Sequence, residues 1–380
     1  MKLFRLSGIL LCLFIVSCSN DSINTSYPEE INVAWIGPLN GPANLLGVEN
    51  LKAMELAVKI YNKSGQTPKV LIKKYDDNYD FLKSESIYES LKKKKKLPDM
   101  LFLSTYESMF HLSDRLFEDD ILTINPIDND IKLERLNENI ILIAKRTEGL
   151  ARILSAEIKK DKKEKTAILY FDSDSFMPTV ANELWRLLKH TNNSPDLYSY
   201  GKDINDFSQI ISPANLEKYD SLIILAYSES YNILKYIKKT NSKLSLYSLN
   251  TIFGIINKPK FKKLTEGMKI THFTKKDGNE KLADNFLDLY QNEYNTHPNV
   301  HWVSFQAYDS MQIFLKSLAE TYQHESSYPN WKAGIKSIIY KGSVHKCVSG
   351  NIRIGRNGNS SGINMGAYVI RNGTPFALKK

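Results

Sequence analysis

Residues 31–38 read INVAWIGP, and this stretch decides the fold of the chain. Its apolar and β-branched residues have the length and composition of a buried strand, and Gly37-Pro38 ends that strand. Residues 47–61 follow, with apolar side chains at every third or fourth position, which predicts an amphipathic helix. The ordered part of the chain therefore opens with a strand, a loop and a helix.

The same alternation continues over most of the sequence. Strands are predicted at residues 70–74, 100–103, 121–124, 140–143, 166–171, 197–200, 222–226, 244–249, 351–354 and 365–370. Helices are predicted at residues 84–91, 106–117, 149–159, 176–188, 231–239, 282–294 and 302–322. Repeated units of this kind imply parallel sheets with helices on both faces. Because one sheet of this length would be unusual, we expect an α/β protein with two similar lobes.

The first eighteen residues have the layout of an export signal. Lys2 and Arg5 supply positive charge, residues 9–16 are almost entirely apolar, and Ser17 precedes Cys18. The apolar run is too short for a stable membrane span. Two other interpretations stay open, an ordinary secretory signal and a cytosolic protein with an apolar start. We favour an export signal that is cleaved directly before Cys18, so that Cys18 becomes the first residue of the mature protein.

The segment around Cys18 resembles the lipobox of bacterial lipoproteins, whose cysteine carries acyl chains such as palmitate. The resemblance implies a signal peptide at residues 1–17 and a lipid anchor on Cys18. Residues 18–29 are rich in Ser, Asn and Asp and are expected to form a flexible tether. A protein anchored outside the cytoplasmic membrane has no nucleotide supply, so ATP-driven reactions and nucleic-acid partners are not expected. The side of the envelope, inner or outer membrane, stays open.

The composition is that of a soluble globular protein. The 380 residues are 42% hydrophobic and 24% charged, with a formal net charge of +9. After the signal, no segment reaches eighteen consecutive apolar residues, so none is expected to cross a membrane. The run Lys92 to Lys96 is consistent with contact to anionic lipid or nucleic acid, but we favour a solvated helix end.

The sequence contains no motif for catalysis or cofactor binding. It lacks the glycine-rich phosphate loops, the nucleophile elbow and the zinc-binding helix motif. Asp76 and Asp77 are paired acids, yet adjacent residues at a strand end point in opposite directions, which favours turn and cap roles. Cys347 is interpreted as a packed small residue, and His297 and His301 as scattered histidines rather than metal ligands. We therefore expect no enzyme, no cofactor and no metal site.

Three loops follow early strands of the predicted sheet. They cover residues 37–47, 104–108 and 125–130, and they carry hydroxyl, amide and carboxylate groups. Parallel α/β sheets bind ligands at the carboxyl ends of their strands. Helices start just beyond the first two loops, where backbone N–H groups can hold an anionic group. The same residues also fit simple helix caps without a ligand, and the pattern alone leaves both interpretations open.

An ordered set of segments resembles the type I periplasmic binding proteins, and in particular the leucine/isoleucine/valine-binding receptors of ABC importers. The set spans about residues 31–375, and no single motif in it is decisive. Its members are residues 31–42, Gly47 with Ala53, Ala57 and Tyr61-Asn62, Tyr75-Asp76-Asp77 with Asp80, Lys145-Arg146-Thr147, Ala307-Tyr308-Asp309, and Gly350-Asn351-Ile352 with Asn357-Gly358 and Asn372-Gly373.

The resemblance implies two lobes joined by three crossovers, which close like a hinge on a small ligand. The crossovers are expected near Ala144, Ile270 and Val348. Lobe 1 would then comprise residues 30–144 plus 271–348, and lobe 2 would comprise residues 145–270 plus 349–380.

The resemblance also implies a set of ligand-binding residues. Ser104, Thr105 and Tyr106 stand where relatives hold a ligand carboxylate, and Asp128 is placed to pair with an ammonium group. Asn250 stands near the position of an acidic residue in amino-acid-binding members, which weakens the assignment of a free amino acid. The complete implied set is Asn40, Leu46, Ser104, Thr105, Tyr106, Asp128, Asn129, Tyr227, Asn250 and Phe305.

Two functional hypotheses follow from the resemblance. In the first, the chain is an extracytoplasmic solute-binding lipoprotein that delivers an amino acid or a similar small polar ligand to an ABC permease. In the second, it is a non-transport protein on the same fold, either a ligand sensor or a lipoprotein activator of cell-wall synthases.

Overall fold

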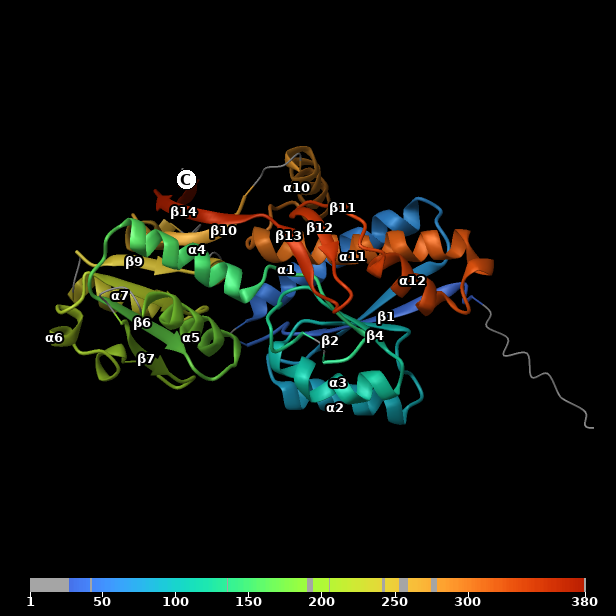
Figure 1. The fold of residues 1–380 in the computed structure, drawn as a ribbon, viewed down its shortest axis with the longest axis horizontal. Coiled ribbons are helices and arrows are strands. Elements are labelled where there is room, and N and C mark those ends of the chain that lie inside the picture. The colour runs from blue at the N-terminus through green and yellow to red at the C-terminus, as the bar shows by residue number, and fades with distance from the viewer. Residues whose placement is uncertain are drawn as a thin grey trace, which may run out of the picture.

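The fold consists of two lobes, each built on its own sheet (Figure 1). The computed structural model describes residues 27–41, 43–134, 136–189, 194–204, 206–240, 243–252, 259–274 and 279–378. The predicted signal peptide and Cys18 lie outside these ranges. None of the helices in the described ranges combines the length and apolar composition of a membrane span.

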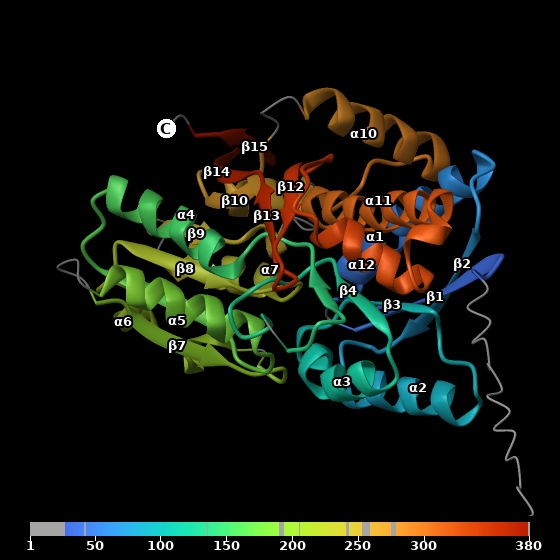
Figure 2. The same ribbon diagram turned by 45° about the vertical axis from the view of Figure 1, so that its right-hand side comes forward.

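Lobe 1 contains a five-stranded parallel sheet in the order β2-β1-β3-β4-β5. Its strands are β1 (Glu30–Gly37), β2 (Lys69–Asp76), β3 (Met100–Leu103), β4 (Leu122–Asn125) and β5 (Ile140–Leu142). Helices α2 (Phe81–Lys93) and α3 (Tyr106–Glu118) lie on one side of the sheet in Figure 2. The other side carries α1 (Asn44–Lys63), α10 (Glu280–Tyr294), α11 (His301–Gln323) and α12 (Trp331–Tyr340).

Lobe 2 contains a seven-stranded sheet in the order β15-β14-β10-β9-β8-β6-β7. The parallel strands are β6 (Thr166–Phe171), β7 (Asp196–Tyr200), β8 (Ser221–Leu225), β9 (Ser245–Ser248) and β10 (Lys269–Phe273). Two antiparallel strands complete it, β14 (Met365–Arg371) and β15 (Thr374–Ala377). Its helices are α4 (Thr147–Lys160), α5 (Phe176–Leu188), α6 (Pro213–Leu216), α7 (Ser230–Thr240) and α9 (Lys262–Thr265). The predicted fold class, two α/β lobes with parallel sheets, is confirmed.

A third sheet, of three strands, lies beside the connection between the lobes. It is formed by β11 (His345–Lys346), β12 (Gly350–Ile354) and β13 (Ser360–Ile363). Short 3₁₀ helices complete the described elements, η1 (Phe207–Gln209), η2 (Asn250–Ile252), η3 (Pro259–Phe261) and η4 (Glu325–Ser327).

The boundaries between the lobes differ in part from those expected. The first crossover joins β5 to α4 and includes the expected Ala144. Ile270 instead lies inside β10, which pairs with β9 and β14, so the return to lobe 1 comes after Phe273. Val348 precedes β12, whose Ile352 and Ile354 belong to the hydrophobic core of lobe 1. The third crossover therefore lies at the junction of β13 and β14.

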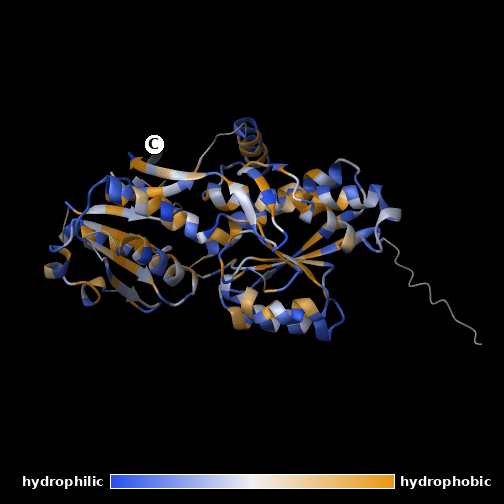
Figure 3. Cartoon of the chain, viewed as in Figure 1, coloured by the Kyte–Doolittle hydropathy of each residue, from blue (hydrophilic) through white to orange (hydrophobic). Residues whose placement is uncertain are grey.

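Hydrophobic residues concentrate on the strands and on the inner faces of the helices (Figure 3). Trp35 on β1 is fully buried between the sheet and α1, where its indole N–H donates to Asn50 Oδ1 at 2.8 Å. Cys347 is buried in the lobe 1 core and carries a free thiol, so it packs as a small residue, as predicted. Lys92 lies in the last turn of α2 and pairs with Asp119 at 2.8 Å, and Lys94 to Lys96 are exposed, as expected of a solvated helix end.

Candidate functional site

The loops at the carboxyl ends of the two sheets meet between the lobes. Tyr79, in the loop after β2, donates its hydroxyl to Asp174 Oδ2 in the loop after β6 at 3.0 Å. Glu107 in the first turn of α3 accepts the backbone N–H of Ser175. These contacts join lobe 1 to lobe 2 directly. The site where α/β folds bind ligands is therefore shared by both lobes.

A buried polar cluster at this junction contains two tyrosines and one aspartate. The hydroxyl of Tyr227 donates to Asp174 Oδ2 at 2.7 Å and lies 3.0 Å from the hydroxyl of Tyr79. Asp174 also accepts the backbone N–H of Met177 at 2.9 Å. Burial is the main cause that raises the pKa of Asp174 to about 6, with a further increase from the nearby Glu107. The carboxylate consequently gains its negative charge just below neutral pH.

The backbone around Tyr79 holds an uncommon conformation. Asn78 and Tyr79 have φ of 56° and 59°, in the left-handed region that bulky side chains rarely occupy. Asp76 Oδ1 accepts the N–H of Asn78 and Asp77 Oδ1 accepts the N–H of Tyr79, each at 2.9 Å. The two aspartates thus hold a turn, as predicted, and that turn presents Tyr79 to lobe 2. Local strain of this kind is characteristic of functional sites.

Three of the predicted site residues lie near this cluster on the lobe 1 side. Thr105 donates its hydroxyl to Asp77 Oδ2, and Tyr106 donates its hydroxyl to Asp130 Oδ2. Asp128 is 5% exposed, and its carboxylate accepts from Asn125 Nδ2 at 3.4 Å. Burial raises the pKa of Asp128 well above its usual range, and Glu107, Asp130 and Asp174 raise it further.

Three other predicted residues make contacts within lobe 1 or at the crossovers. Asn40 is exposed and donates its side-chain amide to Asp76 Oδ2 at 2.8 Å. Ser104 donates to Asn50 Oδ1 at 3.3 Å, toward the lobe 1 core. Asn129 donates to the carbonyl of Ala144 at 3.0 Å and to that of Ser360 at 3.3 Å, which links two crossovers.

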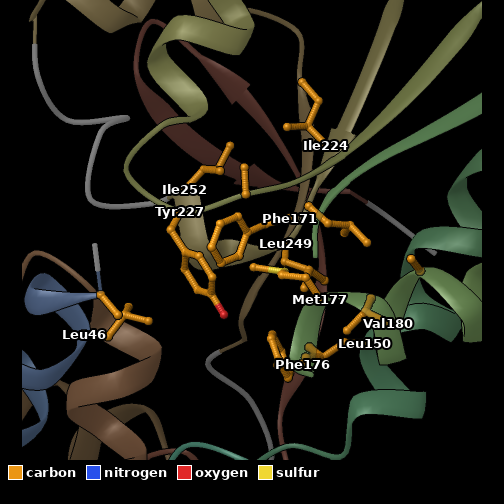
Figure 4. Packing of buried hydrophobic residues seen from close by; sticks show 14 of the residues in the cluster. Leu46, Leu150, Phe171, Phe176, Met177, Val180, Ile224, Tyr227, Leu249 and Ile252 are labelled. Carbon is orange, nitrogen blue, oxygen red and sulfur yellow. The ribbon is translucent and has the colours of Figure 1, made fainter. Parts of the chain in front are cut away.

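The apolar side of the junction contains further predicted residues. Figure 4 shows Tyr227 beside Phe171, with its hydroxyl pointing out of the hydrophobic cluster and Leu46 of α1 across from it. Asn250 is buried and its carbonyl accepts from the indole of Trp302 on α11 at 3.3 Å.

Phe305 lies away from the Tyr79–Tyr227–Asp174 cluster. Its ring contacts Phe273 at a centroid distance of 4.6 Å and Phe286 at 5.3 Å, both edge to face. Phe305 therefore belongs to the lobe 1 core, where it packs from α11 against α10 and the end of β10.

Sequence analysis did not single out Tyr79, Glu107 or Asp174. Asp174 follows the predicted strand 166–171, and Glu107 lies inside the predicted loop 104–108, so both were in segments of the right kind. No local pattern marks which side chain of such a loop reaches the other lobe. Among the described residues, no group of three or more His, Cys, Asp or Glu side chains is arranged to hold a metal ion.

The chain was compared with known proteins by family and by structure. The family model described as "Periplasmic binding protein" matches residues 30–359. No curated protein sequence gives a match.

Solved structures share the fold at low sequence identity. LivJ from Streptococcus pneumoniae, solved in complex with isoleucine, has a TM-score of 0.77 at 15% identity, over 92% of this chain and 98% of its own. The leucine-binding protein LivK from Thermotoga maritima has a TM-score of 0.77 at 14% identity, over 92% of this chain and 98% of its own. A solute-binding protein from R. palustris, solved in complex with benzoate, has a TM-score of 0.76 at 14% identity, over 92% of this chain and 95% of its own.

The family match covers most of the sequence, and the two-lobed architecture agrees with it. The family is one of binding proteins, not enzymes, as predicted. The chain belongs to the periplasmic binding protein family.

Proposed function

We propose that this chain is the solute-binding lipoprotein of an ABC importer and captures a small polar ligand between its lobes. One observation carries the proposal: Tyr79 of lobe 1 contacts Asp174 and Tyr227 of lobe 2 at the carboxyl ends of both sheets. A ligand that binds between these loops touches both lobes, so it binds the closed arrangement more tightly than the open one. A binding protein needs no catalytic group, and its polar lining supplies the recognition.

A ligand is expected to raise the melting temperature of the protein. Binding to the folded state stabilises it by about 2.7 kcal/mol at a hundredfold excess over Kd. A thermal-shift screen over amino acids, amides, small carboxylates and amines measures this effect. Tyr227→Ala should abolish the shift, whereas Tyr198→Ala should retain it, because the hydroxyl of Tyr198 contacts Tyr219 on the far side of lobe 2. The absence of any shift across the whole screen would contradict the proposal.

The anchoring of the protein is a second part of the proposal. Tyr27, at the start of the described chain, donates to the carbonyl of Glu325 at 3.1 Å and packs edge to face on Tyr322. These two contacts hold the first described residues of the chain at the carboxyl end of α11, on lobe 1. The eight residues 19–26 span at most roughly 30 Å when extended, so lobe 1 would stay close to the membrane.

Replacing Cys18 with alanine is expected to release the protein into the soluble fraction without a change in ligand affinity. Stable anchoring needs more than one acyl chain, and the substitution removes the attachment point for all of them. Fractionation of cells and a binding assay on the released protein provide the two measurements. Retention in the membrane fraction would contradict the anchor, and co-purification with a cell-wall synthase instead of a permease would favour the non-transport hypothesis.

A further inference from the structure

We propose that the cavity beside the first crossover binds a small organic anion through its phosphate or carboxylate groups. This is a second site, beyond the proposed function, because none of Tyr79, Asp174 and Tyr227 lines the cavity. Three features of the cavity support the inference: its size, the excess of positive charge on its walls, and two side chains whose donors have no partner among the described residues.

The cavity has a volume of about 670 Å³ and lies where the first crossover joins the lobes. Its lobe 1 wall is formed by β13, through Ser361 and Ile363, and by Ile131 in the loop after β4. The first crossover, α4 and α5 form the remaining walls. Arg152, Arg186 and Ser361 are exposed, so a solute can enter from the solvent. A space of this size is typical of sites for small molecules.

The walls of the cavity carry more positive than negative charge. Four cationic and two acidic side chains line it: Lys145, Arg146, Arg152, Arg186, Glu148 and Glu183. Glu183 accepts from Nε and Nη2 of Arg186 at 2.8 and 2.7 Å. Arg146 pairs with Glu148 at 3.4 Å and with Glu134, outside the lining, at 2.7 Å. Both lining acids are thus paired with arginines, and positive charge stays in excess among these groups even when Glu134 is counted.

Lys145 places part of this charge at the β13 wall. Its ammonium group donates to the carbonyl of Ile363 at 3.2 Å, and both residues line the cavity. The Lys145 side chain also passes over Gly149 at the start of α4, where a Cβ atom would lie 3.0 Å from Cε of the lysine. The ammonium group is therefore held beside the cavity by contacts with both lobes.

Arg152 and Ser361 offer hydrogen-bond donors to an anion. In the ranges that the structure describes, neither side chain takes part in a hydrogen bond or an ion pair with another residue. The guanidinium of arginine presents five N–H donors in a planar fork that matches the oxygen atoms of carboxylates and phosphates. Arg152 belongs to α4 of lobe 2 and Ser361 to β13. An oxyanion that accepts from both would link the lobes beside the crossover.

The test measures the binding of defined probes to the purified full-length protein in mild detergent, by titration calorimetry. Glycerol 3-phosphate and succinate are the anionic probes, and glycerol and putrescine are the neutral and cationic comparisons. We expect saturable binding of at least one anionic probe and none of the comparisons, and the two probes distinguish a phosphate from a carboxylate site. Failure of both anionic probes to bind would overturn the inference and leave the proposed function intact.

Arg152→Gln is expected to weaken binding of the anionic probe about tenfold, because it removes a charged hydrogen-bond donor. The melting temperature without ligand should not change, since the Arg152 side chain has no partner among the described residues. The matched control is Arg371→Gln, which removes the same charge from an exposed residue at the opposite end of β14 from the crossover. Equal losses of affinity in the two variants would indicate attraction to the overall charge of the chain and would overturn the site.

Glu183→Gln should change the affinity in the opposite direction. The substitution removes an acid from the lining and releases the guanidinium of Arg186 from its bidentate pair. We expect the affinity for the anionic probe to rise about threefold. A lower affinity in this variant would contradict the placement of the anion between α4 and α5.

A comparison of two variants separates this cavity from the interlobe junction. A ligand of the junction loses its thermal shift in Tyr227→Ala and should keep it in Arg152→Gln. The anionic probe should show the reverse pattern, because Arg152 lines the cavity and Tyr227 does not. Loss of anion binding in Tyr227→Ala, with full binding in Arg152→Gln, would place the anion at the junction and overturn the second site.

Discussion

Replacing Gly47 with alanine is expected to lower the free energy of unfolding by about 3 kcal/mol or more. Gly47 lies in the first turn of α1, directly against the loop that follows β1. A Cβ atom at this position would lie 1.8 Å from the carbonyl oxygen of Pro38, so the backbone itself must move. That movement would displace α1 from β1, to which it is linked by the hydrogen bond between Trp35 and Asn50. Urea unfolding followed by tryptophan fluorescence measures the loss, since Trp35 on β1 lies beneath α1.

The matched control is Gly149→Ala in α4. A Cβ atom there meets only the flexible end of Lys145, at 3.0 Å. Alanine favours the helix by roughly 0.5–1 kcal/mol over glycine, so this variant should be as stable as the wild type or slightly more stable. A loss of stability in Gly149→Ala equal to that in Gly47→Ala would show that the contact with Pro38 is not the cause.

Replacing Asp309 with alanine is expected to lower the free energy of unfolding by about 3 kcal/mol or more. Asp309 is 1% exposed and extends from α11 to the segment before β12. Its carboxylate accepts the N–H of Val348 at 2.8 Å, the N–H of Ser349 at 2.7 Å and the hydroxyl of Ser349 at 2.5 Å. Alanine would leave all three donors without this acceptor, and each such loss costs about 1–3 kcal/mol. Urea unfolding at pH 7 provides the measurement, with exposed Asp288→Ala as a control that should change stability by less than about 0.5 kcal/mol.

The Asp309→Asn variant distinguishes the effect of the hydrogen bonds from the effect of the negative charge on this side chain. Burial raises the pKa of Asp309 to about 6, from 3.8 in an exposed aspartate. As the pH rises from 4 to 6, the unfolded chain therefore releases this proton before the folded chain does, and wild-type stability falls. The asparagine side chain of the variant cannot ionise, so the stability of the wild type relative to this variant should decrease over that interval. A difference that stays constant with pH would show that Asp309 keeps an ordinary pKa in the fold.

The sequence predicted the elements well where apolar residues recur at a regular interval. The strand at residues 31–36 is β1, the helix at 47–61 lies within α1, and the helix at 302–322 lies within α11. β10 was not predicted, because Lys269-Ile270-Thr271-His272-Phe273 mixes polar and apolar residues without a clear period. Its burial comes from strands on both sides, and one of them, β14, lies almost a hundred residues later in the chain.

The candidate site could be predicted only as a set of loops. Ser104 and Tyr227 both follow buried strands, and no feature of the local sequence distinguishes their positions. In the structure, Ser104 turns toward Asn50 within lobe 1, whereas Tyr227 reaches Asp174 and Tyr79 at the junction. The direction of each side chain depends on the neighbouring strand and on the opposite lobe. Neither neighbour is specified by the local sequence.

The sequence by itself determined the class of this protein. The alternation that begins with INVAWIGP at residues 31–38 fixes parallel α/β lobes, because burial of one strand and one helix face follows from local periodicity. Only the tertiary structure decided which residues meet between the lobes. Tyr79, Glu107, Asp174 and Tyr227 are up to 148 residues apart, and their contacts depend on how two separately folded sheets pack.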